Sequence, residues 1–346
     1  MSLAFTQIDD AVLLTQEHLI RKGAFLDLQT DLSDHTLVRE LWKGRKKKFE
    51  GGHPWEFNAQ IDHNHSARTV GLFETDGSAL QDTMIQGSVE PRHVNAHYIY
   101  DQREPAFQRG GAAIVDLVNT RYVAMQISLF ELLEEILWGK PATSADTRTP
   151  YGIAYWVTKT LVGTEGFGGL DPVGFAAGKG NIAIATTARW ANYTANYVAV
   201  TKEDLVRKMR KAHRNIQFRS PVSHAQPELG PTGNGIYTND AVIGLLEEIL
   251  EDQNMNLGND LDSKGGKTLF KGTSVQYAPK LDADTQNPVY MLDWKWLVLG
   301  VLAGWENNLT KPYMVPDKHL VRRVDLDATL QMVCTNLRKQ AVLNVA

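Results

Sequence analysis

The chain has 346 residues, of which 43% are hydrophobic and 22% charged, and it carries a formal net charge of -4 at pH 7. This composition is that of a soluble globular protein with room for two domains, and it argues against a chain whose whole surface neutralises nucleic-acid phosphates. The single cysteine, Cys334, excludes an intrachain disulfide, and no apolar run reaches membrane length. Because no signal peptide follows Met1, we expect an intracellular protein with no membrane partner.

The first 45 residues have too little apolar bulk to form a core. A short helix is predicted from Asp9 to Arg21, and the rest of this segment should lie on another part of the molecule as an arm. Its end holds the densest basic run of the chain, which comprises Lys43, Arg45, Lys46, Lys47 and Lys48. This run fits either a solvated surface or a contact with another subunit or with nucleic acid.

Residues 49–109 are polar and rich in His, Asn, Gln and Gly. Strands are predicted at Thr69–Phe73 and at His93–Tyr100, where apolar and polar residues alternate. Such a long, weakly apolar stretch predicts an extended excursion with a functional or intermolecular role.

The longest helix is predicted from Gly110 to Gly139, where Gly139 and Pro141 supply a helix stop. Its apolar residues recur every three or four positions and should face a sheet. This stripe comprises Ile114, Leu117, Val118, Tyr122, Met125, Leu129, Leu132, Leu133 and Ile136.

The region after this helix mixes loops, helices and strands. A short strand is predicted at Gly152–Lys159. One helix should start at Thr201, with Asp204 in a weak capping box, and another should follow Asn239 and Asp240. The buried face of the second helix should comprise Val242, Leu245, Leu246, Ile249 and Leu250, and further strands are predicted at Thr268–Phe270, Ser274–Tyr277, Val289–Leu292 and Lys295–Val301.

The C-terminal segment has the most regular pattern. Every even position from Val324 to Cys334 is apolar, which predicts one long half-buried antiparallel strand. Cys334 should then be a buried small apolar group, and Gln340–Val345 could add a last strand.

No pattern specifies an active site, a metal site or a cofactor. Lys264–Thr268 resembles the end of a phosphate-binding loop, but Leu261 stands where a glycine is required and a strand follows. Asp282 and Asp284 have carboxylate spacing, yet Asn287 occupies the glycine position of a calcium loop, so a turn is the better interpretation. The histidines, including His63 and His65, form no metal-binding motif.

The order of these parts, together with local signatures, resembles one known family. The signatures are PYGIAYWV (Pro150–Val157), RWANYTANY (Arg189–Tyr197), GIYTNDAVIGLLEEILEDQNMNLGND (Gly235–Asp260), GTSVQYAPKLDADTQNPVYMLDW (Gly272–Trp294) and LQMVCTNLRKQAVL (Leu330–Leu343). The chain is similar to the major capsid protein of tailed double-stranded DNA bacteriophages, which has the Hong Kong 97 fold.

This resemblance implies an α+β fold with four parts. Residues 1–50 would be the N-terminal arm, 51–109 the extended loop and its base strands, 110–140 and 303–346 a peripheral domain with a spine helix, and 141–302 an axial domain. The implied function is that of a structural protein, not an enzyme, that self-assembles into pentamers and hexamers of an icosahedral head around double-stranded DNA. Assembly would occur in the host bacterial cytoplasm. The implied partners are other copies of the chain, a separate scaffolding protein, a portal, a possible cement protein and non-specifically contacted DNA.

The resemblance also suggests residues that would contact neighbouring subunits. These candidates are Lys46, Lys47, Lys48, Phe73, Glu74, Arg92, Arg103, Lys179, Asn256, Asp260, Lys311, Asp317 and Arg322. Two alternatives stay open at this point: a bacterial encapsulin-type compartment shell, and a nucleotide-dependent enzyme that uses Lys267 and Thr268. The signatures from Arg189 onward favour the phage protein.

Overall fold

The structure is a computed structural model. It describes residues 35–42, 44, 46–60, 62, 67–72, 83–104, 111–160, 163, 165–217, 233–254 and 268–345, with backbone only at 111–119 and 251–254. The predicted helix at Asp9–Arg21 therefore lies outside the described residues.

Helices and strands alternate irregularly along the chain. In chain order they are η3 (Val38–Trp42), β1 (Lys46–Phe49), β2 (Trp55–Gln60), β3 (Met84–Val89), β4 (Arg92–Asp101), α3 (Gly111–Trp138), α4 (Ile153–Trp156), β5 (Tyr193–Tyr197), α5 (Leu205–Ile216), β6 (Asn234–Thr238), α6 (Asp240–Asn254), β7 (Leu269–Phe270), β8 (Thr273–Tyr277), η4 (Pro279–Leu281), β9 (Val289–Asp293), β10 (Leu297–Leu302), β11 (Asn308–Leu309), β12 (Tyr313–Met314), β13 (Val321–Cys334), η5 (Leu337–Lys339) and β14 (Ala341–Val345).

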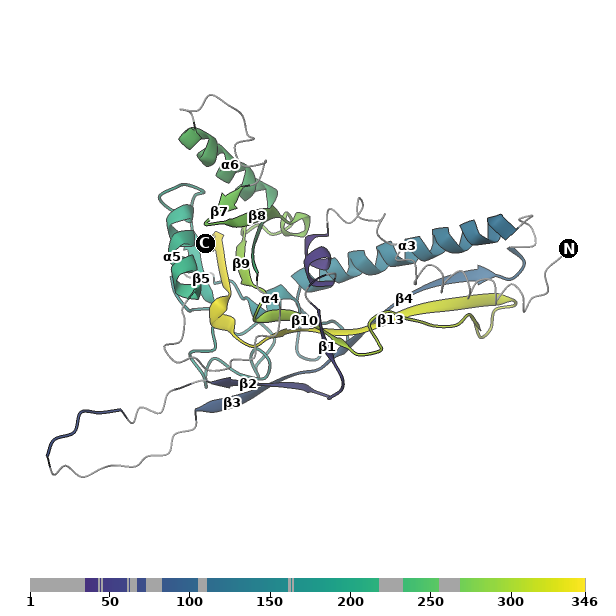
Figure 1. The fold of residues 1–346 in the computed structure, drawn as a ribbon, viewed down its shortest axis with the longest axis horizontal. Helices are drawn as coiled ribbons and strands as arrows, with labels where there is room; N and C mark the ends of the chain where they lie inside the picture. Colours follow the sequence, from purple (N-terminus) through teal and green to yellow (C-terminus); the bar gives the residue numbers. More distant parts are fainter. Residues whose placement is uncertain are drawn as a thin grey trace.

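The first sheet is organised around β13, its longest strand. β4 pairs antiparallel with β13 along one edge, from Arg92 opposite Leu330 to Asp101 opposite Val321. β10, β11 and β12 follow one another along the other edge of β13, and β1 adds a parallel strand beyond β10. Figure 1 shows β13 and β4 running the length of one arm of the molecule, with α3 lying along them.

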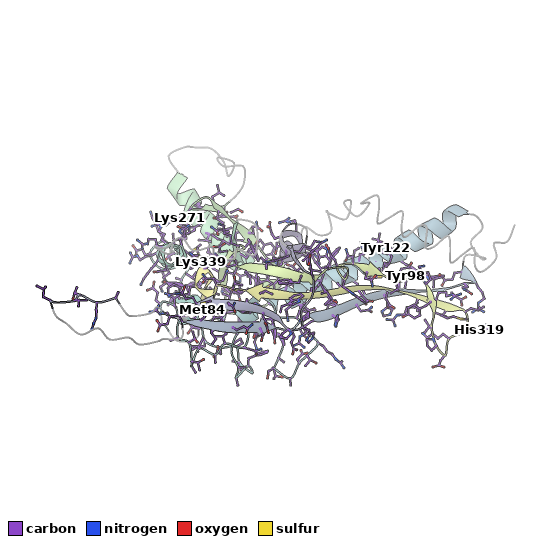
Figure 2. The ribbon with its side chains drawn as sticks, turned by 60° about the horizontal axis from the view of Figure 1, so that its bottom comes forward. Met84, Tyr98, Tyr122, Lys271, His319 and Lys339 are labelled. Atoms are coloured by element: carbon purple, nitrogen blue, oxygen red, sulfur yellow. The ribbon has the colours of Figure 1, made fainter. Side chains whose placement is uncertain are left out.

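The spine helix α3 confirms the predicted long helix to within one residue at its C-terminal end. Its buried side chains on the sheet side are Tyr122, Met125, Leu129, Leu133 and Leu137. Tyr122 and Tyr98 of β4 lie at this helix-sheet contact, and both are labelled in Figure 2. The predicted stripe is wrong at Leu132, which is 41% exposed, because the sheet-facing row passes through Leu133 and continues to Leu137.

The predicted C-terminal strand is confirmed as β13, and all six of its even positions from Val324 to Cys334 are buried. The expectation of a half-buried strand is wrong for its second half. Thr329, Gln331 and Val333 are buried as well, so both faces of this part are covered.

The second sheet has the strand order β5-β14-β9-β6-β8-β7. One face packs against α5 and α6 through Leu205, Met209, Val242 and Leu246. The other face joins the core of the first sheet, where the Trp138 ring at the end of α3 meets Tyr237 and Tyr290.

Most of the predicted strands are confirmed, as β4, β7, β8, β9, β10 and β14. The strand predicted at Gly152–Lys159 is wrong, because the turn of helix α4 occupies this segment. Gly152 lies directly against the end of α3, where an added Cβ would come within 2.3 Å of the carbonyl oxygen of Ile136. The strand predicted at Thr69–Phe73 is also wrong for its described residues, since residues 69–72 form no strand.

The predicted helix caps are present in part. Asn239 Oδ1 accepts a hydrogen bond from the Val242 amide at the start of α6, as expected for an N-cap. Thr201 Oγ1 accepts from the Asp204 amide, but the helix itself begins only at Leu205. On α6, Val242 and Leu246 are buried as predicted, Ile249 is half-buried, and Leu245 and Leu250 are exposed.

The two sheets combine strands from several of the predicted ranges, and the first sheet includes β1 from residues 1–50 and β4 from residues 51–109. β10, predicted with residues 141–302, lies in the first sheet, whereas β14, predicted with residues 303–346, lies in the second. None of the helices in the described part of the chain combines the length and apolarity that a membrane crossing needs.

Candidate subunit-contact surfaces

The described residues that could carry chemistry include Cys334, which lies in the core of the fold. Within the described ranges, no group of three His, Cys, Asp or Glu residues is placed to hold a metal ion. Cys334 is fully buried, and burial raises the pKa of its thiol to about 12, so it is not a reactive thiolate near neutral pH. This agrees with the predicted buried apolar role.

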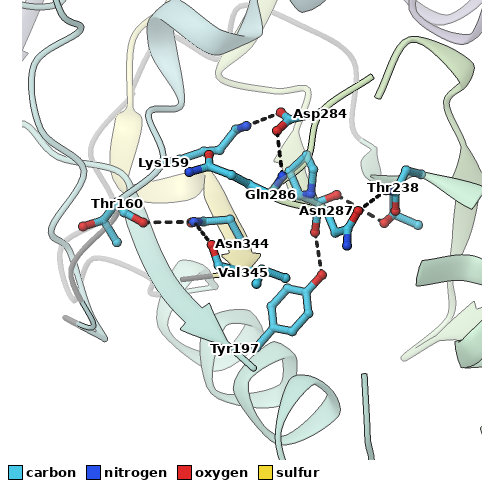
Figure 3. A network of polar contacts seen from close by, with 11 residues as sticks. Lys159, Thr160, Tyr197, Thr238, Asp284, Gln286, Asn287, Asn344 and Val345 are labelled. Carbon is cyan, nitrogen blue, oxygen red and sulfur yellow. Dashed lines mark hydrogen bonds and ion pairs between the residues drawn. The ribbon is translucent and has the colours of Figure 1, made fainter. Parts of the chain in front are cut away.

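The carboxylates near Asn287 fasten a turn, as predicted. Asp284 pairs with Lys159 and accepts a hydrogen bond from the Gln286 amide at 3.1 Å. Figure 3 shows how the Tyr197 hydroxyl reaches the same turn, donating to the Asn287 carbonyl at 2.5 Å. The Lys264–Lys267 segment lies outside the described residues, and the strands predicted after Thr268 are present as β7 and β8.

A two-stranded ribbon, β2 and β3, extends away from the first sheet on the side opposite the N-terminal end of α3 (Figure 1). Its register runs from Trp55 opposite Val89 at the base to Gln60 opposite Met84. Trp55 and Val89 are buried, whereas Met84 is 50% exposed. The ribbon thus has a fixed base and an exposed outer end.

Aromatic stacking fixes the base of the ribbon. The Trp55 ring stacks on Phe49 of β1 with centroids 4.3 Å apart, and the Phe57 ring stacks on Trp190 at 5.9 Å. The Ser88 amide donates to the Gly180 carbonyl at 2.9 Å. These contacts tie both strands to other parts of the chain.

Two glycines make room for the Phe57 ring. A Cβ at Gly87, on the opposing strand, would come within 2.4 Å of this ring. Gly180 has a φ of +61°, and a Cβ there would lie 3.0 Å from both Phe57 and Trp156. The half-buried Phe57 ring is therefore closely packed against Gly87 and Gly180, which ties the ribbon to the body.

The basic run before the ribbon forms a strand, β1, that the sequence pattern did not predict. Lys46 and Lys48 both pair with Glu306, the latter at 3.0 Å. Burial, followed by the charge of Lys48, lowers the pKa of Lys46. Lys47 lies 5.7 Å from the centre of the Phe49 ring. Lys46 is thus largely occupied within the chain, while the Lys48 side chain remains 64% exposed.

The far end of the first sheet carries four other predicted contact residues. Lys311 and Asp317 are exposed, and Figure 2 labels the neighbouring His319 at this extremity. The Arg103 guanidinium donates two hydrogen bonds to Asp101 and the Arg103 amide donates a third, and together they hold the pKa of that carboxyl at about 2. Arg322 is half-buried, and its position in β13 lies opposite Tyr100 of β4.

Two predicted contact residues are buried within the chain, so their assignment to a subunit interface is wrong. Lys179 has no exposed surface, and its Nζ donates to Thr158 Oγ1 and Asn192 Oδ1, both at 2.8 Å. Burial lowers the pKa of Lys179 to about 7. Arg92 is also buried, and its guanidinium lies 5.8 Å from the centre of the Tyr151 ring. Phe73, Glu74, Asn256 and Asp260 lie outside the described residues.

One structurally important residue was missed. Glu134 of α3 is fully buried and accepts hydrogen bonds from the Leu37 and Val38 amides at 3.1 and 2.9 Å. It also accepts from Trp138 Nε1 at 2.9 Å. A carboxylate here satisfies backbone donors at the start of a helical turn, and so attaches residues 36–42 to the spine helix. An acidic residue between Leu133 and Leu137 in the apolar stripe is the only sequence signal for this contact.

No protein-family model matches the chain, and no curated protein sequence matches it. Solved structures do match over almost the full length. A chain of the "Cyanophage A-1(L) capsid asymmetric unit" is 15% identical with a TM-score of 0.59, covering 90% of this chain and 92% of that one. A chain from Gordonia phage Cozz is 9% identical with a TM-score of 0.51, covering 90% and 86%. A chain from the capsid of a native GTA particle is 8% identical with a TM-score of 0.50, covering 90% of each. The chain therefore has the Hong Kong 97-type fold of phage capsid proteins, which confirms the predicted fold class.

Proposed function

We propose that this chain is a major capsid protein, which self-assembles into pentamers and hexamers of an icosahedral phage head that encloses double-stranded DNA. The observation that carries the proposal is the match in fold to a cyanophage capsid chain over 90% of this chain. A projecting ribbon with a buried base and an exposed outer end suits a part that lies on a neighbouring subunit.

The sheets suggest how the domains divide. We assign the first sheet with α3 to the peripheral domain and the second sheet with α5 and α6 to the axial domain, so that β10 joins the former and β14 the latter. β2 and β3 form the base of the extended loop. The scaffolding protein, portal, cement protein and host-cytoplasm assembly remain predictions.

The direct test is electron microscopy and sedimentation of the purified chain, alone and with a candidate scaffolding protein. Closed icosahedral particles, or isolated pentamers and hexamers, support the proposal. A chain that stays monomeric under every assembly condition contradicts it. Particles that enclose protein cargo and exclude DNA would point instead to the encapsulin-type shell.

The ribbon permits a sharper test. Gln60 and Met84 are paired, so residues 61–83 can be replaced by an Asn-Gly turn without changing the register. We expect this variant to fold with an unchanged thermal midpoint but to lose assembly, because its contact with the neighbour is removed. A control that keeps residues 61–83 and changes Gln86 to Thr should assemble normally. Normal shells from the shortened chain would contradict the role given to the ribbon.

A further inference from the structure

Helix α5 carries an unusual concentration of positive charge for an acidic protein. Its 12 residues include Arg207, Lys208, Arg210, Lys211 and Arg214 and no acidic residue. Leu205, Met209 and Ala212 are buried against the second sheet. Four of the basic residues are exposed at i, i+3, i+4 and i+7, which places them in one row on the outer side; these are Arg207, Arg210, Lys211 and Arg214, the basic stripe.

Within the part of the chain that the structure describes, one residue of the basic stripe has an ion-pair partner. Lys211 forms an ion pair with Glu165 at 2.9 Å. Among the described residues, no ion pair involves Arg207, Arg210 or Arg214. Like charges three and four positions apart on a helix repel one another, so the arrangement costs stability in the isolated chain. An anionic partner would reverse this cost.

Helix α6 has the opposite composition. Its 15 residues include Asp240, Glu247, Glu248, Glu251 and Asp252 and no basic residue. Asp240, Glu247 and Glu248 are exposed, and so is Leu245; these four residues are the acidic face. Glu247 accepts a hydrogen bond from Thr268, while the described part of the chain offers Glu248 no ion pair.

The two helices pack on different strands of the second sheet, and the His213 ring of α5 also lies 6.1 Å from the Phe270 ring of β7. α5 contacts β5 and β14, and α6 contacts β8. Figure 1 shows α5 along one outer side of this sheet and α6 beyond β7 and β8. A ring of identical subunits closes through a contact between two different surfaces of the same chain. One positive and one negative surface, carried by two different helices of the same chain, meet this requirement.

We propose that the basic stripe of one subunit docks on the acidic face of α6 in the adjacent subunit within each pentamer and hexamer. This inference rests on the proposed capsid function and identifies the surfaces that join the axial domains. Nucleic acid is the other candidate for the basic stripe. The second copy is favoured because the complementary charge is on the same chain and because exposed Leu245 supplies an apolar contact, which protein interfaces use and phosphate binding does not need.

Exchange of the charges tests the pairing directly. One variant carries Arg207→Glu and Arg210→Glu, a second carries Glu247→Lys and Glu248→Lys, and a third carries all four changes. Glu in the first half of α5 and Lys in the second half of α6 suit the helix dipoles, so each monomer should fold. We expect about a tenfold or larger rise in the protein concentration needed for assembly in the first two variants, because like charges then face each other. The third variant should assemble within about threefold of the unchanged chain, because the charge pairing is restored with reversed sign.

The control variant carries Arg39→Glu and Arg148→Glu, two exposed arginines outside both surfaces with the same change in net charge. It should assemble like the unchanged chain. Failure of the third variant to regain assembly, with all monomers folded, would overturn the inference. So would normal assembly of the first variant with reduced DNA content, which would assign the basic stripe to nucleic acid. In either case the unchanged chain still forms shells, whereas failure of the proposed function would leave that chain unassembled.

An equal mixture of the first two variants offers an independent measurement. Each variant repels itself, but alternating subunits present opposite charges at every contact. Alternation closes a ring of six and cannot close a ring of five. We therefore expect hexamers without pentamers in the mixture, and five-membered rings of mixed composition would contradict the pairing.

Discussion

Two buried ionisable side chains, one on the spine helix and one in the loops that lead into the second sheet, are satisfied in different ways. Glu134 receives hydrogen bonds from two backbone amides, the Thr36 hydroxyl and the Trp138 indole. Among the described residues, Lys179 donates to two neutral oxygens, those of Thr158 and Asn192. Both residues have no exposed surface.

The difference shows what each residue does for the fold. Glu134 joins segments almost one hundred positions apart, so it determines where the chain before β1 lies on α3. Lys179 lies between Gly178 and Gly180, whose positive φ values let the backbone bend around it. It holds nearby loops together, and burial without a carboxylate in hydrogen-bond contact lowers its pKa to about 7.

Removal of the Glu134 carboxylate should have the largest effect. Glu134→Ala would leave the Leu37 and Val38 amides without their acceptor in a buried site. We expect a loss of about 3–5 kcal/mol in the free energy of unfolding, because two buried amides each lose a hydrogen bond to a charged acceptor, worth about 1.5–3 kcal/mol per bond. Urea unfolding measures the loss, and hydrogen exchange should show selective deprotection of residues 37 and 38. Glu135→Ala, at the exposed neighbouring position, should change stability little; equal losses in both variants would contradict the anchoring role.

Two adjacent leucines test the register of α3 on the first sheet. Leu133 is fully buried and Leu132 is 41% exposed. Leu133→Ala should cost about 2–5 kcal/mol, because it removes buried apolar volume and leaves a cavity. Leu132→Ala should cost well below that in the monomer, since 41% of the Leu132 surface is already exposed to solvent. Chemical denaturation of both variants measures the difference, and similar losses would mean that the helix presents another face to the sheet.

The elements that local periodicity governs were the ones predicted well. β13 and β4 alternate with period two, and α3 repeats every three to four residues, so each pattern specifies its own structure. β1 has no such pattern: KKKF becomes a strand because β10 offers a parallel edge and Glu306 lies beside Lys46 and Lys48. Leu132 belongs to the predicted stripe but is exposed, whereas Leu137 lies outside that stripe but is buried. The row of α3 that faces the sheet passes through Leu133 and Leu137, and this depends on how the helix is rotated against the sheet.

The candidate contact residues were harder to predict than the fold. The order of the sequence signatures was sufficient for the fold, because it reflects the order of the elements. The sequence does not distinguish a charged residue that is exposed from one that is buried. Lys179 can be buried because Thr158 and Asn192, from other parts of the chain, accept its hydrogen bonds. Glu134 depends likewise on residues 36–38, far away in the chain.

The buried Lys179 should make a smaller contribution to the free energy of unfolding, and this contribution should depend on pH. Its pKa is about 7 in the folded chain and near 10.4 when unfolded, so the unfolded chain binds more protons between these values. The free energy of unfolding should therefore rise with pH from about 7, by up to ~1.4 kcal/mol per pH unit from Lys179. This contribution is lost again as the pH falls from about 10.4 towards 7. Burial raises the pKa of Tyr122 to about 12, and ionisation of such tyrosines in the unfolded state opposes the trend above pH 10.

Urea unfolding at pH 7 and pH 9 measures this contribution below the range of the tyrosines. Lys179→Met should have a smaller rise between the two pH values than the unchanged chain. Lys202→Met, at an exposed position before α5, should keep the full rise. The same rise in all three proteins would show that Lys179 is not the group responsible.

Substitution of Glu306 should cause the smallest loss of stability, because this carboxylate is partly exposed whereas Glu134 is fully buried. Its carboxylate pairs with Lys46 and Lys48 at a site that retains contact with solvent. Glu306→Gln should cost about 1 kcal/mol or less, because solvent weakens such pairs. The loss should shrink in 1 M NaCl, where charges are screened over ~3 Å, whereas the loss in Glu134→Ala should persist. Unfolding of both variants at low and high salt measures the difference. A salt-insensitive loss at Glu306 would mean that β1 is held by a buried ion pair, and the two carboxylates would then have the same structural role.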